Sequence, residues 1–145
     1  MKRLMTILAV SAMTMTMAAI APAADAPPSA TLALREGSVA AGIGWSWGRG
    51  KLNYKGVIHE FKVDGLSVGE VGITSASADG KVFGLTDLAN FNGTYVSVAT
   101  EATVGLGAGA TAMKNEHGVV IHLYPTTKGV NVKLAGEGVK LTLIN

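Results

Sequence analysis

The sequence predicts a small all-β domain, built as an antiparallel barrel or barrel-like sandwich with one short helix. Apolar residues alternate with small or polar residues along most of the chain after residue 38, which is the pattern of half-buried strands. Short apolar runs are separated by turn residues at even spacing, which is typical of meanders and small barrels. The chain has 19 glycines and no cysteine, so stability must come from packing and hydrogen bonds rather than disulfides.

The start of the chain predicts a cleavable secretory signal peptide over residues 1–23. A positive start, Lys2-Arg3, precedes an uncharged run of 17 residues and the small-x-small pattern Ala21-Pro22-Ala23. A retained membrane anchor fits less well, because the run is at the lower limit of a span and no basic stop-transfer cluster follows. We therefore expect cleavage after Ala23 and a periplasmic or otherwise exported protein, from a Gram-negative bacterium.

Cleavage would change the charge balance of the chain. The whole sequence has 12 Lys and Arg against 10 Asp and Glu, and removal of Lys2 and Arg3 leaves 10 against 10. A neutral mature protein without a clustered basic face does not predict nucleic-acid binding. We divide it into a flexible leader over residues 24–37, where two adjacent prolines disfavour regular structure, and one β domain over residues 38–145.

The first predicted strand runs from Ser38 to Gly48 and alternates over its whole length. Its apolar face carries Val39, Ala41, Ile43, Trp45 and Trp47. The opposite face consists of Gly, Ala and Ser only, which lets another backbone or a bulky side chain come close and suits a bent strand. Residues 51–54 continue the strand to a two-residue turn at Lys55-Gly56.

Seven further strands and one helix are predicted. The strands are Val57–Val63, Leu66–Thr74, Lys81–Leu85, Thr94–Leu106, Val119–Tyr124, Val130–Leu134 and Val139–Ile144. Turn residues fall at Asp64-Gly65, Ala78–Gly80, Asn115–Gly118, Pro125–Gly129 and Ala135–Gly138. The helix covers Thr86–Phe91, with Thr86 as its cap, Gly93 as its stop, and Leu88 and Phe91 as its buried residues.

A serine motif is the only hint of nucleophilic catalysis. Gly65-Leu66-Ser67-Val68-Gly69 matches the spelling of a nucleophile elbow, but that elbow requires a strand-to-helix turn in a larger parallel sheet. The context here predicts a strand on both sides of the serine. We therefore interpret Gly65 as a turn residue and Gly69 as a bend, and expect a protein that is not an enzyme.

Metal and cofactor sites are not predicted. His59, His117 and His122 lack the close spacing of a metal motif, and no thiol is available. Gly105–Gly109 resembles a phosphate-binding loop only in glycine content, because no helix follows it. Glu101 lies in an apolar-to-small strand and is interpreted as facing water.

The aromatic residues are the best candidates for a binding site. The candidate ligand-binding residues are Trp45, Trp47, Tyr54, Phe61, Phe83 and Tyr95. Two interpretations remain open. These side chains fill the core, or they line an apolar pocket or a membrane interface, where an amphipathic ring is favoured.

Several glycine and apolar positions point to a known family. They are Gly65-Leu66-Ser67-Val68-Gly69, Gly72, the helix over Leu85–Phe91, the small residues through Gly109, Lys128-Gly129-Val130 and Leu134–Gly138. Over residues 38–144 the chain resembles the barrel portion of the SYLF lipid-binding family, and related small exported barrels linked to envelope integrity in Gram-negative bacteria. The resemblance implies a compact barrel with an apolar interior, a periplasmic location, and association with lipid or the envelope. The chain is shorter than the SYLF domain and lacks its basic amphipathic N-terminal helix.

Three functional hypotheses follow. The first is an exported, non-enzymatic envelope protein that binds lipid or another apolar small molecule, or associates peripherally with the envelope. The second is a small outer-membrane barrel, although the last strands are short for that class and the chain lacks an aromatic end. The third, and least favoured, is a hydrolase that uses Ser67 with a histidine.

Overall fold

The protein is described by a computed structural model, which covers residues 27–40, 44–69, 72–98, 107 and 109–144. The strands are β1 (Ala30–Ala40), β2 (Gly44–Tyr54), β3 (Val57–Asp64), β4 (Leu66–Val68), β5 (Ala78–Phe83), β6 (Gly93–Ser97), β7 (Thr111–Lys114), β8 (Val120–Pro125), β9 (Val132–Leu134) and β10 (Val139–Leu143). One 3-10 helix, η2 (Leu88–Phe91), precedes β6. The predicted signal peptide, Glu101 and most of the glycine run at 105–109 lie outside the described residues.

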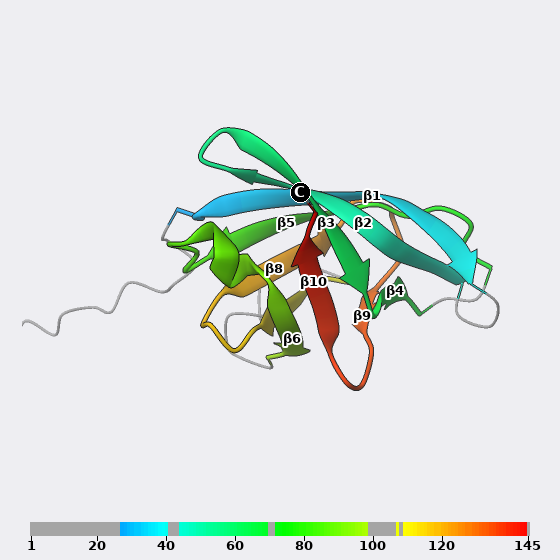
Figure 1. Ribbon diagram of the computed structural model, residues 1–145. Coiled ribbons are helices and arrows are strands. Elements are labelled where there is room, and N and C mark those ends of the chain that lie inside the picture. The colour runs from blue at the N-terminus through cyan, green and yellow to red at the C-terminus, as the bar shows by residue number, and fades with distance from the viewer. Residues whose placement is uncertain (1–26, 41–43, 70–71, 99–106, 108, 145) are drawn as a thin grey trace, which may run out of the picture.

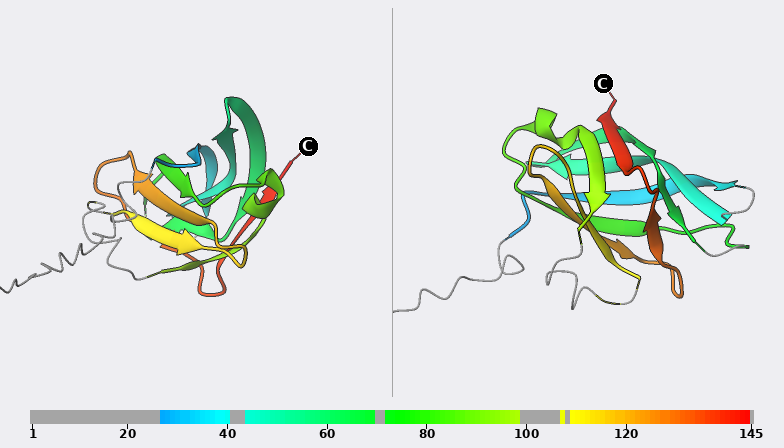
Figure 2. Two further views of the ribbon diagram at one scale, coloured as in Figure 1. Left: turned by 90° about the vertical axis from the view of Figure 1, so that its left-hand side faces the viewer. Right: turned by 90° about the horizontal axis from the view of Figure 1, so that it is seen from below.

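The strands form a closed antiparallel barrel, so the predicted all-β fold is confirmed. The wall follows the order β1-β5-β8-β7-β6-β10-β3-β2, and β2 returns to pair with β1. Figure 1 shows this wall from the side, and Figure 2 shows the strands wrapping around a common axis. Closure leaves the main wall without a free edge, which removes the usual site of strand-to-strand aggregation.

Two short strands extend the wall rather than add to its circumference. Gly65, at φ +102°, interrupts the strand that pairs with β2, so that β3 lies before the break and β4 after it. On the neighbouring strand of the wall, β9 pairs with β4 and β10 pairs with β3, and residues 135–138 lie between β9 and β10. The turn predicted at 64–65 is therefore an irregularity within one long strand, whereas the turn predicted at 135–138 is confirmed, because the Gly138 N–H donates to the Ala135 carbonyl at 2.8 Å.

Large side chains fill the barrel interior. Phe61, Phe91 and Tyr95 are fully buried, and the Phe61 and Phe91 rings meet edge to face with centroids 5.0 Å apart. The Tyr95 hydroxyl donates to the Phe91 carbonyl at 2.6 Å, which holds helix η2 against the core through its buried Phe91. Burial, and to a lesser extent the carboxylate of Glu116, raises the pKa of Tyr95, which keeps this hydroxyl a donor.

Two glycines make this filling possible. Gly50 lies opposite Phe61 on the neighbouring strand, and a Cβ atom at Gly50 would overlap the Phe61 ring and stand 2.7 Å from Leu34 Cδ2. Gly80 has the same role, because a Cβ there would stand 2.7 Å from Leu32 Cδ1 and 3.1 Å from Leu123 Cδ2. The small residues on the wall therefore complement the large residues beside them.

The predicted leader is wrong from residue 30 onward. Residues 30–40 form β1, which pairs with both β2 and β5 and buries Ala30, Leu32 and Leu34. The alternation at residues 30–34 is a strand pattern, which the nearby prolines obscured. The single predicted strand at Ser38–Gly48 is also wrong. It is a hairpin in which Ala40 pairs with Gly44, a residue with φ +80°.

Other boundaries also differ from the prediction. Ala78–Gly80 belongs to β5 rather than to a turn, because Gly80 serves side-chain packing. The strand predicted at Leu66–Thr74 ends at Val68. Asp87, not Thr86, caps the short helix, since its Oδ1 accepts the Ala89 N–H at 3.1 Å.

We expect the substitution Gly50→Ala to destabilise the protein by about 1–3 kcal/mol, because the added methyl group overpacks the contact with Phe61. Gly48→Ala is the matched control. Gly48 is exposed on the same strand, no atom lies within 4 Å of its Cβ position, and its change should stay within about 0.5 kcal/mol. Urea unfolding followed by circular dichroism measures both. Equal losses at the two positions would contradict the filled interior.

Candidate functional site

A matched kink in β1 and β2 shapes the outer surface. Ala33 pairs with Lys51 and Glu36 with Arg49, so β1 has one extra residue opposite Gly50. One step further, β2 has the extra residue instead. Both irregularities turn two consecutive side chains outward and reset which face points inward.

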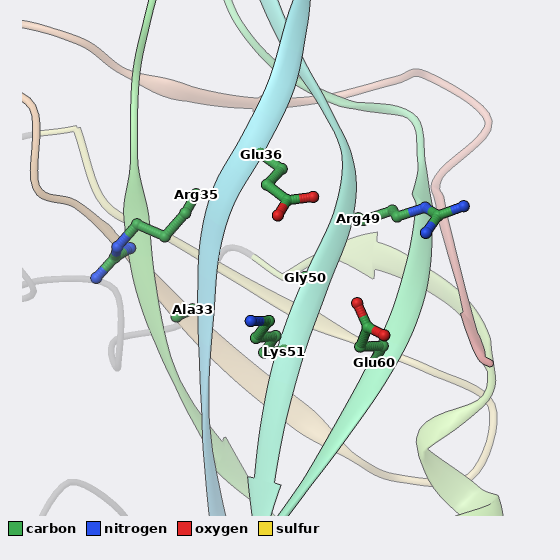
Figure 3. A pocket seen from close by; sticks show the side chains of 7 residues that line it. All are labelled: Ala33, Arg35, Glu36, Arg49, Gly50, Lys51 and Glu60. Atoms are coloured by element: carbon green, nitrogen blue, oxygen red, sulfur yellow. The ribbon is translucent and has the colours of Figure 1, made fainter. Parts of the chain in front are cut away.

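A small pocket lies at this kink. It has a volume of about 80 Å³, and Ala33, Glu36, Gly50, Lys51 and Glu60 are among its lining residues. Figure 3 shows the Glu36 carboxylate and the Lys51 ammonium group above the gap between β1 and β2. The space is sufficient for a few water molecules or one small ion, and too small for a lipid chain.

Arg35 fastens the kink to β5. Its guanidinium donates to the Ala78 carbonyl at 2.8 Å and to the Leu34 carbonyl at 3.2 Å, and it pairs with Asp79 at 2.5 Å. Figure 3 shows it turned away from the pocket and over β5. The planar fork of donors therefore stabilises the bulge, while the ion pair itself is half-exposed and contributes little.

A trough of about 450 Å³ continues from the pocket along the outer face of β1. Its floor consists of the small residues Thr31 and Ala33, whose cross-strand neighbours are longer. Lys51 stands on the β2 side, and Lys81 stands on the β5 side. A short side chain between longer ones on both sides produces a groove along the strand.

Aromatic and aliphatic groups border the trough. Lys81 Nζ lies 5.5 Å from the centre of the Tyr124 ring, and burial raises the pKa of Tyr124. Ile58 lines the trough from β3 and is 57% exposed. The trough thus combines apolar contact surface with two cations, and Asp79, the acid within it, is already paired with Arg35.

A second groove lies beside the hairpin of β1 and β2. It has a volume of about 610 Å³, and its lining includes a row in which Ser38 pairs with Ser46, Ser46 with Ser67, and Ser67 with Lys133. Ser46 and Gly48, which also line this groove, belong to the small-residue face that the sequence predicted. The Lys133 side chain lies across Gly69, with its Cδ 2.7 Å from a Cβ position there.

The serine motif therefore lacks the context of a nucleophile elbow. Ser67 is in β4, and the residues that flank it in the sheet are Ser46 and Lys133 rather than a histidine. Gly65, predicted as a turn residue, is a bend between β3 and β4 at φ +102°.

The predicted aromatic site is not one pocket. Phe61 and Tyr95 are fully buried in the core, and Trp47 and Tyr54 are 2% and 9% exposed within the same cluster. Phe83 packs outside this cluster on His122, with ring centroids 4.8 Å apart. Of the two interpretations, filling of the core describes most of these residues.

The two tryptophans hold the hairpin in place. The Trp47 Nε1–H donates to the Ala76 carbonyl at 3.1 Å, which ties β2 to the segment before β5. Trp45 lies across Gly37, with Cε2 2.8 Å from a Cβ position there. Its indole nitrogen is buried and has no hydrogen-bond partner within the described residues.

The histidines do not converge on a metal site. His59 is in β3, His117 lies in a turn with its Nε2 3.6 Å from Glu116, and His122 is in β8. Among the residues that the structure describes, no group of three metal-ligating side chains is present. Glu116 accepts the Thr94 N–H at 3.2 Å, and hydrogen bonds from its own and the Thr94 backbone N–H lower its pKa.

Sequence reasoning missed the charged residues of the kink and trough. Arg35 and Glu36 fell within the predicted leader, and Lys81 was assigned to a strand without a role. The available signal was the break in alternation at Arg35-Glu36 and Gly48-Arg49, where consecutive residues on both strands are exposed.

The fold and its surfaces define a small β-barrel protein. No family model matches the chain, and no curated protein does. A β-barrel-like, uncharacterised protein from Brucella abortus has a similar crystal structure, with a TM-score of 0.53 and 21% identity over 81% of this chain and 73% of that chain. At this identity the similarity shows the fold, and the resemblance to the SYLF family remains a prediction. No helix in the described part of the chain is long and apolar enough to cross a membrane.

We predict that His122 makes stability depend on pH. Burial, and then the nearby Lys81, lower the pKa of His122 below its ordinary value of 6.5, so the folded protein favours the neutral ring. Stability should be full above pH 6.5 and fall as the pH drops below it, until the folded-state pKa is passed. Urea unfolding across this range should show the fall in the native protein and not in His122→Gln. His117→Gln, in an exposed turn, is the control and should retain the fall in stability. If the fall disappeared in His117→Gln and persisted in His122→Gln, the assignment of the pH dependence to His122 would be contradicted.

Proposed function

We propose that this chain is an exported, non-enzymatic protein of the Gram-negative cell envelope that contacts lipid or another apolar partner with its outer surface. The filled interior carries this proposal. The gap among Leu34, Phe61, Met113 and Leu141 at the centre of the barrel has no room for a water-sized molecule. An acyl chain inside the barrel would require several core side chains to leave, so the predicted internal ligand site is replaced by an external one.

The polar outer wall disfavours the outer-membrane alternative. Lys51, Lys62 and Lys81 are exposed on β2, β3 and β5, whereas their neighbours along each strand are glycine or apolar residues and are buried. A membrane-spanning barrel has the opposite arrangement, with its apolar band facing lipid. The hydrolase alternative has no support from the surroundings of Ser67 described above.

We expect export to remove residues 1–23. Mass spectrometry of a periplasmic extract should find a protein that begins at Ala24. Ala23→Glu should block cleavage, because signal peptidases require a small residue at that position. Ala26→Glu, within the alternative pattern, is the matched control and should be processed normally. A cytoplasmic protein that retains Met1 would overturn the exported location.

We expect lipid contact to be reversible and external. The purified mature protein should carry no tightly bound lipid in native mass spectrometry, because the core is filled. It should nevertheless sediment with vesicles made from a total lipid extract of a Gram-negative envelope. A stoichiometric bound lipid would contradict the filled interior, and failure to sediment with these vesicles would overturn the lipid part of the proposal.

A further inference from the structure

The tip of the β2–β3 hairpin exposes two adjacent aliphatic side chains. Val57 and Ile58 are 55% and 57% exposed, and they follow a turn in which Lys55 and Gly56 have φ of +52° and +82°. The other large hydrophobic residues exposed in the described chain, Val39 and Val96, stand singly. Figures 1 and 2 show this hairpin projecting from the barrel wall.

Packing within the fold does not require these two side chains. Val57 pairs with Tyr54 and Ile58 with Asn53, but more than half of each aliphatic side chain remains in water. A polar β-branched residue such as threonine would support the same strand pairing. Successive residues of a strand point to opposite faces, so Val57 and Ile58 place one aliphatic side chain on each face of the projecting tip. An exposed apolar tip of this kind marks a surface for an apolar partner.

Cations lie at this tip and along the trough beside it. Lys55 is in the turn itself, and Lys51 and Lys81 share the trough with Ile58. None of the three makes an ion pair within the described residues. Glu60 lies opposite Lys51 in the register of β2 and β3. Lys55 lies 5.2 Å from the centre of the Tyr54 ring, which keeps its charge beside the apolar tip.

We infer that the β2–β3 tip and the adjacent trough form a docking surface for an anionic lipid bilayer. This inference rests on the proposed function and names the part of the surface that would carry it. Val57 and Ile58 would enter the interfacial region, and Lys51, Lys55 and Lys81 would face lipid phosphates. Lysine stems contact apolar surface while their ammonium groups remain at the headgroup level, and tyrosine is favoured at the same depth.

The size of the apolar tip favours a bilayer over a protein partner. Specific protein interfaces bury about 800 Å² on each partner around a well-packed centre. Two aliphatic side chains on a narrow hairpin supply only a small part of that area. A bilayer needs no matching shape, and its anionic lipids attract each nearby lysine, with an effect of about fivefold in affinity per residue.

Sedimentation with vesicles of defined composition tests the inference. The mature protein should bind vesicles of phosphatidylethanolamine with phosphatidylglycerol about tenfold or more tightly than vesicles of phosphatidylcholine alone. The double variant Val57→Ser/Ile58→Ser should bind the anionic vesicles about tenfold more weakly. Lys51→Gln/Lys81→Gln should lose about tenfold or more on anionic vesicles and change little on phosphatidylcholine.

Matched variants on other faces separate the possible results. Val39→Ser/Val96→Ser removes the other two exposed valines, and Lys114→Gln/Lys140→Gln removes two exposed lysines on β7 and β10. Both should bind like the native protein, and unfolding curves should show that every variant is folded. Native-like binding by Val57→Ser/Ile58→Ser would overturn the tip while leaving the proposed function intact. Equal binding of the native protein to both vesicle types would overturn the role of the lysines. Failure to bind any vesicle, the total extract included, would be a failure of the proposed function itself.

Discussion

Room inside the barrel is the constraint on which the other features depend. An eight-strand wall encloses a narrow space, and Phe61, Leu34, Leu32 and Leu123 fit into it because Gly50 and Gly80, on the strands beside them, carry no side chain. Helix η2 then places Phe91 at one end, and the Tyr95 hydroxyl fixes the chain there. The interior is consequently solid. Binding must therefore use the outer surface, because any internal ligand would compete with side chains that are fully buried.

The kink in β1 and β2 connects this core to the outer surface. Gly50 faces inward under Phe61, while its neighbours Arg49 and Lys51 face outward at the pocket. The extra residue in β1 opposite Gly50 opens the pocket, and the compensating residue in β2 restores the pairing that continues into the hairpin. One local irregularity thus separates two sections of the wall. The barrel section carries long, charged side chains on its outer face, and the hairpin section carries small side chains, several of them serines. Arg35, at the kink, contacts Ala78 and Asp79 of β5.

The sequence predicted the features that depend on residues close together in the chain. Alternation identified the all-β class, and glycine placed the turn at Lys55-Gly56 and the bend at Gly65, where φ is positive. The sequence pattern could not distinguish a glycine that turns the chain from one that makes room for a side chain, so Gly80 was assigned to a turn.

The predicted aromatic pocket failed for a related reason. Whether Trp47 or Phe61 faces a cavity or the packed centre depends on register and on the kink, both of which join residues distant in sequence. The first part of β1, up to residue 37, was missed because its short alternation follows two prolines.

Charge and apolar surface are distributed unevenly over the exterior, and this asymmetry favours attachment by one end. The outer face of the wall around the trough carries both lysines and acids, which keep this face hydrated. Val57 and Ile58 lie where that wall ends, at the hairpin farthest from the kink along β2 and β3. A barrel that inserted its wall into lipid would have to dehydrate Lys51, Glu60 and Lys81 together, at a cost of several kcal/mol for each uncompensated charge. Contact through the hairpin tip dehydrates only aliphatic groups and leaves the lysines at the polar boundary, where their charges remain solvated. Burial of a whole wall is thus unfavourable, whereas shallow contact by one tip agrees with the placement of both kinds of residue.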